Sequence, residues 1–325
     1  MRKGNLTVVI PCYNEEEILE TTIASITTKI KQLIEQEKIL PKSDLLLVDD
    51  GSKDKTWHII QEYHQKFPSL IKGIKLSKNA GHQNALLSGL NSVTHDISIS
   101  IDADLQDDIC AIDKMIDAYN EGYDIVYGVR ENRSSDSFLK KNTALQYYRL
   151  MGVMGVEQIA NHADFRLLAR QPLNALSYFG EKNLYLRGII PLLGFPSTKV
   201  FYSRLPRLAG ESKYPLRKML SFAWQGITSF SVMPLRVISI LGGLIFIASI
   251  FILLWLIITK LSGDTVAGWS SLMFSIFFFC GVQLLSLGII GEYIGKIYFE
   301  TKSRPRFIIE TALDLDAKND EITGK

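Results

Sequence analysis

The chain has 325 residues, 47% of them hydrophobic, so it is long enough for one sizeable α/β domain, and its mean hydropathy of +0.11 exceeds what a soluble protein needs. A purely soluble chain is therefore not expected. The 36 Lys and Arg nearly balance the 34 Asp and Glu, and a net charge of +2 gives no reason to predict a nucleic-acid partner. The three cysteines lie far apart, in no metal-ligand spacing, which predicts free thiols in a reducing compartment.

Strand and helix patterns alternate through the first part of the chain. Short apolar, β-branched runs predict buried strands, and the stretches between them carry apolar residues at helical spacing. This alternation is typical of a doubly wound, mostly parallel α/β sheet. Strands are expected at about residues 6–10, 45–48, 71–76, 98–101, 124–129 and 198–202, with helices at about 18–34, 56–67, 81–93, 109–121 and 172–179.

The first strand runs into the turn Pro11-Cys12-Tyr13-Asn14-Glu15. Asn14 with Glu17 three residues later predicts a helix cap. A dinucleotide-binding fold would place Gly-x-Gly-x-x-Gly at this turn. Its absence argues against an oxidoreductase.

The second strand ends at Asp49 and Asp50, followed by a glycine turn. If the sheet is parallel, these carboxylates lie on the same edge as the acidic residues further along the chain. Lys78, just before the third helix, offers a cation beside a helix amino terminus, which would suit a diphosphate. His82 is interpreted as a polar loop residue rather than a ligand.

The fourth strand runs into a dense acidic cluster. Asp102 and Asp104 leave the strand end, and Asp107 and Asp108 are interpreted as favourable residues at the start of the next helix. Carboxylates this close repel one another unless a cation lies among them. Asp102 and Asp104 therefore predict a site for Mg²⁺ or Mn²⁺, hard cations that keep open positions for phosphate oxygens.

The middle of the chain carries basic residues after the fifth strand. Arg130 ends that strand, and Lys140 and Lys141 lie in a helix expected at 138–156, where they could meet an anionic group. The later apolar run at 184–195 is too short and too broken to span a bilayer. It is expected either in the membrane interface or against the active site.

Two uncharged runs of 22 residues, 237–258 and 269–290, are each long enough to cross a membrane. The segment before them has a basic amphipathic helical pattern typical of a membrane surface. Beyond Phe307 the tail is polar and expected to be disordered. The predicted organisation is a catalytic domain at 1–213, an amphipathic juxtamembrane helix at 214–233, two transmembrane helices within 234–296 and a cytoplasmic tail at 297–325.

Basic residues flank both runs, whereas the 259–268 connection carries only Lys260 and Asp264. By the positive-inside rule, both termini and the catalytic domain face the cytoplasm. The expected location is thus the cytoplasmic membrane, with two spans. The oligomeric state stays open, and a homo-oligomer formed through the membrane helices is one alternative.

Four motifs stand together in order: Pro11-Cys12-Tyr13-Asn14-Glu15, Val48-Asp49-Asp50-Gly51-Ser52, Asp102-Ala103-Asp104-Leu105-Gln106 and Arg207-Leu208-Ala209-Gly210-Glu211-Ser212-Lys213. In this combination the chain resembles glycosyltransferase family 2, with the GT-A fold. Within it, the chain is similar to the polyprenyl-phosphate (bactoprenol) glycosyltransferases and to dolichol-phosphate mannose synthase. The resemblance implies a UDP-sugar donor, a polyprenyl phosphate acceptor, such as undecaprenyl phosphate, and a lipid bilayer as partners.

The resemblance also implies roles for individual residues. The divalent metal would be held by Asp102, Asp104 and Gln106, and Asp164 would lie near the acceptor, as base or as positioning residue. Arg204 and Arg207 would neutralise phosphates. The nucleotide sugar would be bound by Pro11, Tyr13, Glu15, Asp49, Asp50, Lys78 and Asp102.

A lipid phosphate has a second pKa near 6 and is already an oxyanion at neutral pH, so transfer to it needs no strong base. The expected reaction is attack on the sugar C1 with inversion, for the modification of cell-envelope glycans. The incoming lipid phosphate is expected to meet Arg130, Lys140, Lys141 and Lys213.

Several alternatives stay open. The sugar is glucose or N-acetylglucosamine. A processive polysaccharide synthase would carry Gln-x-x-Arg-Trp after the base motif, and the nearest string here lacks the Trp. The alternative outside enzymes is a membrane-anchored nucleotide-sugar sensor or scaffold, against which the intact acidic motif argues.

Overall fold

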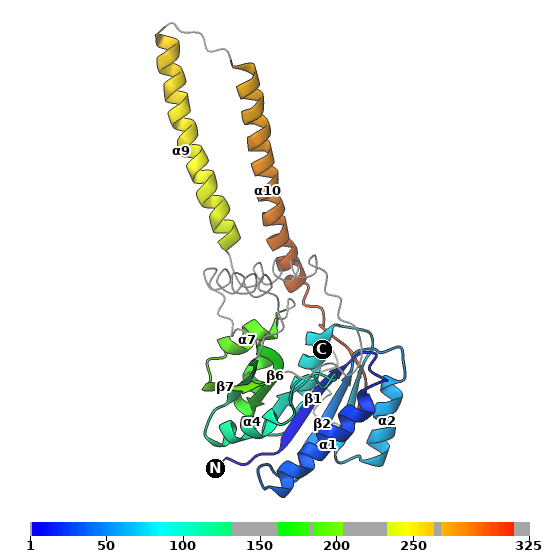
Figure 1. Cartoon of the computed structure of the whole chain (residues 1–325). Helices are drawn as coiled ribbons and strands as arrows, with labels where there is room; N and C mark the ends of the chain where they lie inside the picture. Colours follow the sequence, from blue (N-terminus) through cyan, green and yellow to red (C-terminus); the bar gives the residue numbers. More distant parts are fainter. Residues whose placement is uncertain (1, 132–161, 182–184, 204–232, 263–267, 315–325) are drawn as a thin grey trace. The chain divides into compact units, whose positions relative to one another are not determined.

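A computed structural model of the chain describes residues 2–131, 162–181, 185–203, 233–262 and 268–314 (Figure 1). The chain divides into two compact units. One unit holds a β-sheet with its surrounding helices, and the other holds two long apolar helices.

The first unit is built on one eight-stranded sheet with the order β7-β5-β6-β4-β1-β2-β3-β8. β6 and β8 run antiparallel to their neighbours, and the other strands run in one direction. The mostly parallel α/β sheet expected from the sequence is therefore confirmed. The strands are β1 (Leu6–Cys12), β2 (Asp44–Asp49), β3 (Ile71–Leu76), β4 (Ile97–Ser100), β5 (Ile125–Arg130), β6 (His162–Ala169), β7 (Ser197–Tyr202) and β8 (Ile309–Leu313).

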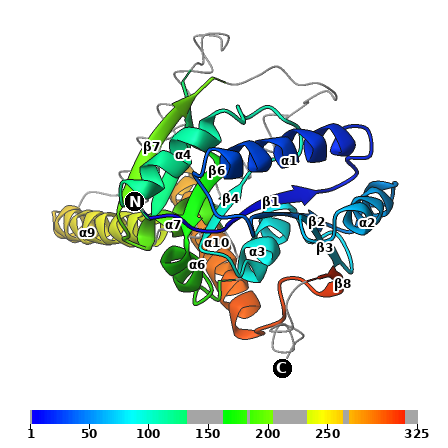
Figure 2. The ribbon, with the colours of Figure 1, turned by 90° about the horizontal axis from the view of Figure 1, so that it is seen from below.

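Helices cover both faces of the sheet (Figure 2). Leu6, Val8 and Ile10 of β1 belong to one buried cluster with residues of α1, α2 and α4. On the opposite face, α3 lies so close that a side chain at Gly89 would collide with Val9 and Val48. Both faces of β1 are thus buried, which explains its apolar sequence. The helices of this unit are α1 (Leu19–Glu35), α2 (Thr56–Lys66), α3 (His82–Ser92), α4 (Ala111–Asn120), α6 (Arg170–Leu176) and α7 (Leu186–Leu192).

The helix cap predicted at Asn14 is wrong. α1 begins at Leu19, and no side chain caps it. The Asn14 side chain instead accepts a hydrogen bond from the Lys53 N–H at 2.9 Å, and the Asn14 N–H donates to Ser52 Oγ at 3.0 Å. With φ of 55°, Asn14 lies in the left-handed region, which asparagine tolerates better than most residues. It therefore joins the loops that follow β1 and β2.

The tail was predicted to be disordered beyond Phe307, and this is wrong for β8. β8 pairs antiparallel with β3, and Lys75 forms an ion pair with Glu310 at 3.1 Å. Arg306 donates a hydrogen bond to the Phe179 carbonyl in the turn that follows α6. Since β8 covers the otherwise open edge of β3, this part of the tail belongs to the sheet, and the predicted boundary at residue 213 does not close the catalytic domain.

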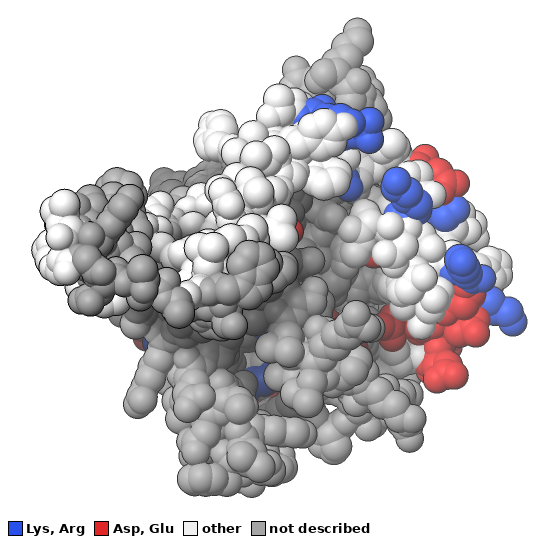
Figure 3. All heavy atoms as spheres, turned by 90° about the horizontal axis from the view of Figure 1, so that it is seen from above, with Lys and Arg blue, Asp and Glu red and all other residues white. Residues whose placement is uncertain are grey.

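The second unit holds α9 (Met233–Leu261) and α10 (Trp269–Thr301). The segments Met233–Ile252 and Phe278–Thr301 are long and apolar enough to cross a membrane, by length and composition, and none of this length is buried within the structure. The runs 237–258 and 269–290 within these helices contain no charged residue. Figure 3 shows most of the described charged side chains of one face of the molecule gathered at the right of the view. Of the amphipathic helix predicted at 214–233, all but Met233 lies outside the described residues.

Candidate active site

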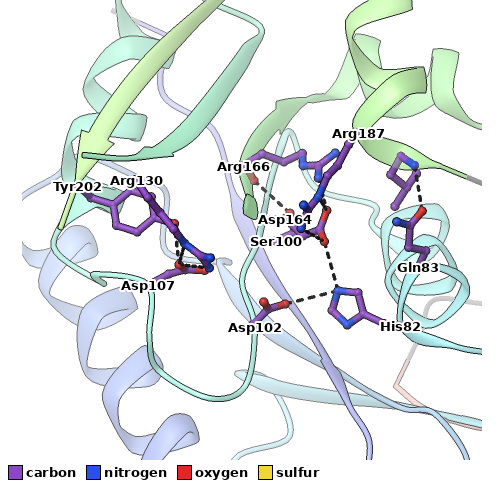
Figure 4. Close-up of polar contacts among 11 residues, drawn as sticks. His82, Gln83, Ser100, Asp102, Asp107, Arg130, Asp164, Arg166, Arg187 and Tyr202 are labelled. Carbon is purple, nitrogen blue, oxygen red and sulfur yellow. Dashed lines mark hydrogen bonds and ion pairs between the residues drawn. The ribbon is translucent and has the colours of Figure 1, made fainter. Parts of the chain in front are cut away.

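The carboxyl ends of β1, β2 and β4 lie at one edge of the sheet because these strands are parallel neighbours, with Cys12 opposite Asp49. β6 is antiparallel to β4, so its first residues reach the same edge. Asp102 and Asp164, which are far apart in the sequence, therefore lie close together (Figure 4). This edge is where open α/β sheets bind ligands.

Asp49 lies at the end of β2 and is fully buried. Its Oδ1 accepts a hydrogen bond from the Ser52 N–H at 3.1 Å, whereas Oδ2 has no hydrogen-bond partner within the described part of the chain. Burial raises the pKa of Asp49. Nearby in the sequence, Pro11 is buried, Glu15 is half-buried, and Tyr13 is 42% exposed, so Tyr13 offers an open aromatic face.

Asp50 was predicted to bind the nucleotide, but its carboxylate bonds to the protein. Its two oxygens accept hydrogen bonds from the Ala80 and Gly81 N–H groups at 2.7 and 3.0 Å. A Cβ at Gly51, whose φ is +67°, would lie 2.7 Å from the backbone of Lys78. Asp50 and Gly51 therefore fix the loop before α3, which presents the exposed Lys78.

The acidic loop after β4 carries the residues that are predicted to bind the metal. Asp102 and Asp104 are partly exposed, whereas Gln106 is buried. Asp104 Oδ1 accepts a hydrogen bond from the Gln106 N–H at 3.2 Å. Leu105 has φ of 51°, a left-handed conformation unusual for this residue type and typical of strained ligand-binding loops.

Asp102 fits a cation. Its Oδ1 is buried, accepts no hydrogen bond in the described part of the chain and meets His82 Nε2 at 3.5 Å. Burial first, and then the nearby carboxylates, raise its pKa to about 6 despite His82. No group of three or more His, Cys, Asp or Glu among the described residues is arranged to hold a metal. Two carboxylates and substrate oxygens would suit Mg²⁺ or Mn²⁺, which bind with few protein ligands.

Asp164, only 5% exposed, is surrounded by three cationic or ionisable side chains. His82 Nε2 lies 3.5 Å from its Oδ2, Arg166 forms an ion pair with Oδ1, and Arg187 donates to both oxygens at 3.1 and 3.4 Å. Burial opposes ionisation, but His82 and the two guanidinium groups hold the pKa of Asp164 well below its usual value. Asp164 is therefore a stable anion and a weak base.

The sequence interpretation missed three residues of this cluster. His82, interpreted as a loop residue, opens α3 and lies between Asp102 and Asp164. Arg166 follows Asp164 by two positions on β6, so the two share a face of the strand, a signal the sequence did contain. Arg187 interrupts an apolar run, and α7 places it against the site, one of the two locations expected for that run.

Asp107 was interpreted as a helix-start residue, and this is wrong. Its Oδ1 accepts hydrogen bonds from Arg130 Nε at 3.2 Å, Arg130 Nη2 at 2.9 Å and the Tyr202 hydroxyl at 2.6 Å. We call these three residues the Asp107 clamp. It joins the acidic loop to the ends of β5 and β7. Arg130 uses Nε and Nη2 on Asp107, and its predicted role in binding lipid phosphate stays a prediction.

The remaining predicted basic residues of the site lie outside the described residues. They are Lys140, Lys141, Arg204, Arg207 and Lys213.

The sequence matches the family model of Glycosyl transferase family 2 over residues 7–189. The chain therefore belongs to this family, as its motifs and sheet indicated, and the expected GT-A fold class and glycosyltransferase activity are confirmed.

Relatives match the chain over nearly its whole length. It is 49% identical to the uncharacterized glycosyltransferase YkoT of Bacillus subtilis, over 98% of this chain and 94% of that protein. It is 39% identical to the bactoprenol glucosyl transferase of Shigella phage SfX, over 94% of this chain and 99% of that protein. It is also 38% identical to the uncharacterized glycosyltransferase sll0501 of Synechocystis, over 96% of each chain. With the two apolar helices, the matches to bactoprenol glucosyl transferases indicate membrane association.

Proposed function

We propose that this enzyme transfers glucose from UDP-glucose to a polyprenyl phosphate at the membrane surface, with inversion at the sugar C1. The observation that carries the proposal is the meeting of Asp102, Asp104 and the Asp164 cluster at one sheet edge in a chain of this family. The names of the full-length relatives favour glucose over N-acetylglucosamine.

The donor would bind along the ends of β1, β2 and β4. Asp49 Oδ2 has no hydrogen-bond partner among the described residues, so it is suited to accept the N3–H of uracil, while Tyr13 would stack on the base. Asp102 and Asp104 would hold Mg²⁺ or Mn²⁺. When bound, the divalent ion neutralises the diphosphate that leaves.

In the transfer, an oxygen of the lipid phosphate forms a bond to C1 as the bond from C1 to the diphosphate oxygen breaks. The acceptor is already an oxyanion near neutral pH, so no proton has to be removed. Asp164, whose charge is compensated by its cationic neighbours, would act by positioning groups rather than as a base. Arg204 and Arg207 are proposed to neutralise phosphates, and Lys140, Lys141 and Lys213 to meet the lipid phosphate.

We propose that both termini of the chain and the catalytic domain face the cytoplasm. β8 follows α10 in the sequence and pairs with β3, which precedes α9. Because paired strands lie on the same side of a membrane, this pairing supports an even number of membrane crossings between β3 and β8. The basic residues that flank the apolar runs support the same side. A homo-oligomer through the membrane helices stays a prediction.

The full chain in detergent, given labelled UDP-glucose or UDP-N-acetylglucosamine with undecaprenyl phosphate, tests the proposal. We expect a glucosyl lipid with a single phosphate, labile to mild acid, whose formation stops with EDTA and resumes with Mg²⁺ or Mn²⁺. A lipid that keeps the β-phosphate of the donor would mean phosphosugar transfer. Absence of any labelled lipid with either donor would refute the proposed reaction.

A further inference from the structure

We infer that Arg187 contacts a phosphate oxyanion of the reacting substrates, and that Asp164 and Gln83 position it. The inference rests on the proposed function, which supplies two phosphate groups: the diphosphate of the donor and the phosphate of the acceptor. It assigns a catalytic residue that none of the sequence motifs contains.

α7 is fixed at its first residue by the helix that opens the donor side of the site. Gln83 Oε1 accepts a hydrogen bond from the Leu186 N–H at 3.0 Å (Figure 4). Gln83 is the neighbour of His82 at the start of α3. The first turn of α3 thus contacts both partners of Arg187. His82 contacts Asp164, which pairs with the Arg187 side chain, and Gln83 binds the backbone N–H of the preceding residue. These two contacts set the position of Arg187.

The two arginines at Asp164 differ in what they can reach. The Arg166 side chain is 1% exposed, whereas the Arg187 side chain is 39% exposed. Arg187 uses its Nε and Nη2 on the carboxylate of Asp164. A guanidinium has five N–H donors, so among the described residues Nη1 and one N–H of Nη2 are not used on Asp164 and can bind a ligand. Arg166 is thus a buried counter-ion, and Arg187 is the arginine of this pair that a substrate can touch.

The location of Arg187 fits a phosphate between it and the acidic loop. His82 Nε2 lies 3.5 Å from both Asp102 and Asp164. Asp164 in turn contacts Arg187, so only His82 and Asp164 connect Arg187 to the predicted metal ligand Asp102. Planar, bidentate recognition of oxyanions is the property in which arginine exceeds lysine. The pair with Asp164 fixes the guanidinium in advance, which lowers the cost of ordering it on binding.

The test compares Arg187→Ala, Arg187→Lys and the control Arg2→Ala in the full chain. Arg2 also forms an ion pair with a carboxylate, that of Asp124 at 2.8 Å, and takes no part in the site described above. We expect Arg187→Ala to lower glucosyl transfer roughly a hundredfold, as for the loss of one preorganised donor, and Arg2→Ala to leave it near wild type. Arg187→Lys should lose less activity than Arg187→Ala but stay below wild type, because lysine keeps the positive charge without the planar pair of N–H donors.

Binding measurements identify which phosphate is touched. If Arg187 meets the acceptor, Arg187→Ala weakens binding of farnesyl phosphate and leaves binding of UDP with Mn²⁺ and the slow hydrolysis of UDP-glucose unchanged. If Arg187 meets the donor, Arg187→Ala binds UDP with Mn²⁺ more weakly, and both the hydrolysis of UDP-glucose and the transfer become slower. Either result supports a phosphate contact. Unchanged transfer in Arg187→Ala would overturn the inference. So would a loss of transfer that is matched by a lower unfolding temperature of Arg187→Ala, if Arg187→Gln restores both to the wild-type values.

These outcomes are separable from failure of the proposed function. If wild-type protein forms no glucosyl lipid, the proposed reaction is wrong, but the two binding measurements still compare Arg187→Ala with wild type. Weaker binding of either phosphate ligand would then support Arg187 as a phosphate contact in a different reaction, and equal binding of both would exclude it.

Discussion

Replacing Tyr202 by Phe should loosen the acidic loop without touching the substrate site directly. Tyr202 ends β7, and its hydroxyl donates to buried Asp107 at 2.6 Å. Burial first, and then the charge of Asp107, raise the pKa of Tyr202, whereas Arg130 lowers it. The hydroxyl therefore keeps the proton that it donates to Asp107. The substitution removes one donor and leaves the packing of the ring against Phe165.

A hydrogen bond to a charged group contributes about 1.5–3 kcal/mol. We expect the lower end, about 1.5 kcal/mol, because Arg130 keeps two hydrogen bonds to the same oxygen in the variant. Asp107→Asn also breaks the ion pair with a partly buried arginine and should cost more, about 3 kcal/mol. Since both changes affect one hydrogen bond, the double variant should be about 1 kcal/mol less destabilised than the sum.

Thermal unfolding in detergent measures these costs, with Tyr178→Phe as control because the Tyr178 side chain is 86% exposed. The concentration of Mn²⁺ needed for half-maximal transfer should rise in Tyr202→Phe, because the clamp holds the loop that carries Asp102 and Asp104. The clamp does not support the loop if Tyr202→Phe is no less stable than Tyr178→Phe and the destabilisations by Tyr202→Phe and Asp107→Asn are additive.

Three further outcomes follow from the described contacts and the sequence. Asp104→Asn should lower transfer roughly a hundredfold with unchanged thermal unfolding, and near-normal turnover with Mg²⁺ or Mn²⁺ would remove the metal proposal. A cysteine introduced at 259–268 should react with an impermeant maleimide outside intact cells, whereas labelling of the tail beyond Phe307 would reverse the topology. The pKa of Asp44 is lowered, because the hydrogen bond and charge of His95, then Thr7 and Lys72, outweigh its burial. Asp44 therefore stabilises the fold above its unfolded pKa of about 3.9, so Asp44→Asn should lower the unfolding temperature at neutral pH, and the difference should shrink as the pH falls below that value. A pH-independent difference would contradict this assignment.

The parallel core of the sheet could be predicted because its signals are local. β1 and β2 are short apolar runs, each followed by a helix of clear periodicity, and the acidic residues lie at or just after strand ends. The carboxyl ends of parallel strands share an edge, so the sequence alone predicts that Asp49 and Asp102 lie on the same edge.

The charged cluster around Asp164 and the strand β8 could not be predicted, because both depend on strand pairings between distant segments. β6 joins β4 antiparallel, which brings Asp164 and Arg166 to the active edge, and no local pattern gives that pairing. β8 forms only because β3 offers an open edge. Asp107 resembled a helix-start residue because its partners Arg130 and Tyr202 are supplied by two later strands. Long-range partners, not local propensity, decided the roles of these residues.

The pairing of Asp164 bears on the kind of acceptor. An enzyme that glycosylates a hydroxyl needs a base that can remove its proton, and such a base works best with a pKa near the operating pH. Asp164 is held as an anion by His82, Arg166 and Arg187, with its pKa well below the usual value despite its burial, so it accepts a proton poorly. A phosphate acceptor brings its own negative oxygen and requires cations instead. The open side of Arg187 offers one, so the cluster favours a phosphate acceptor over a hydroxyl acceptor.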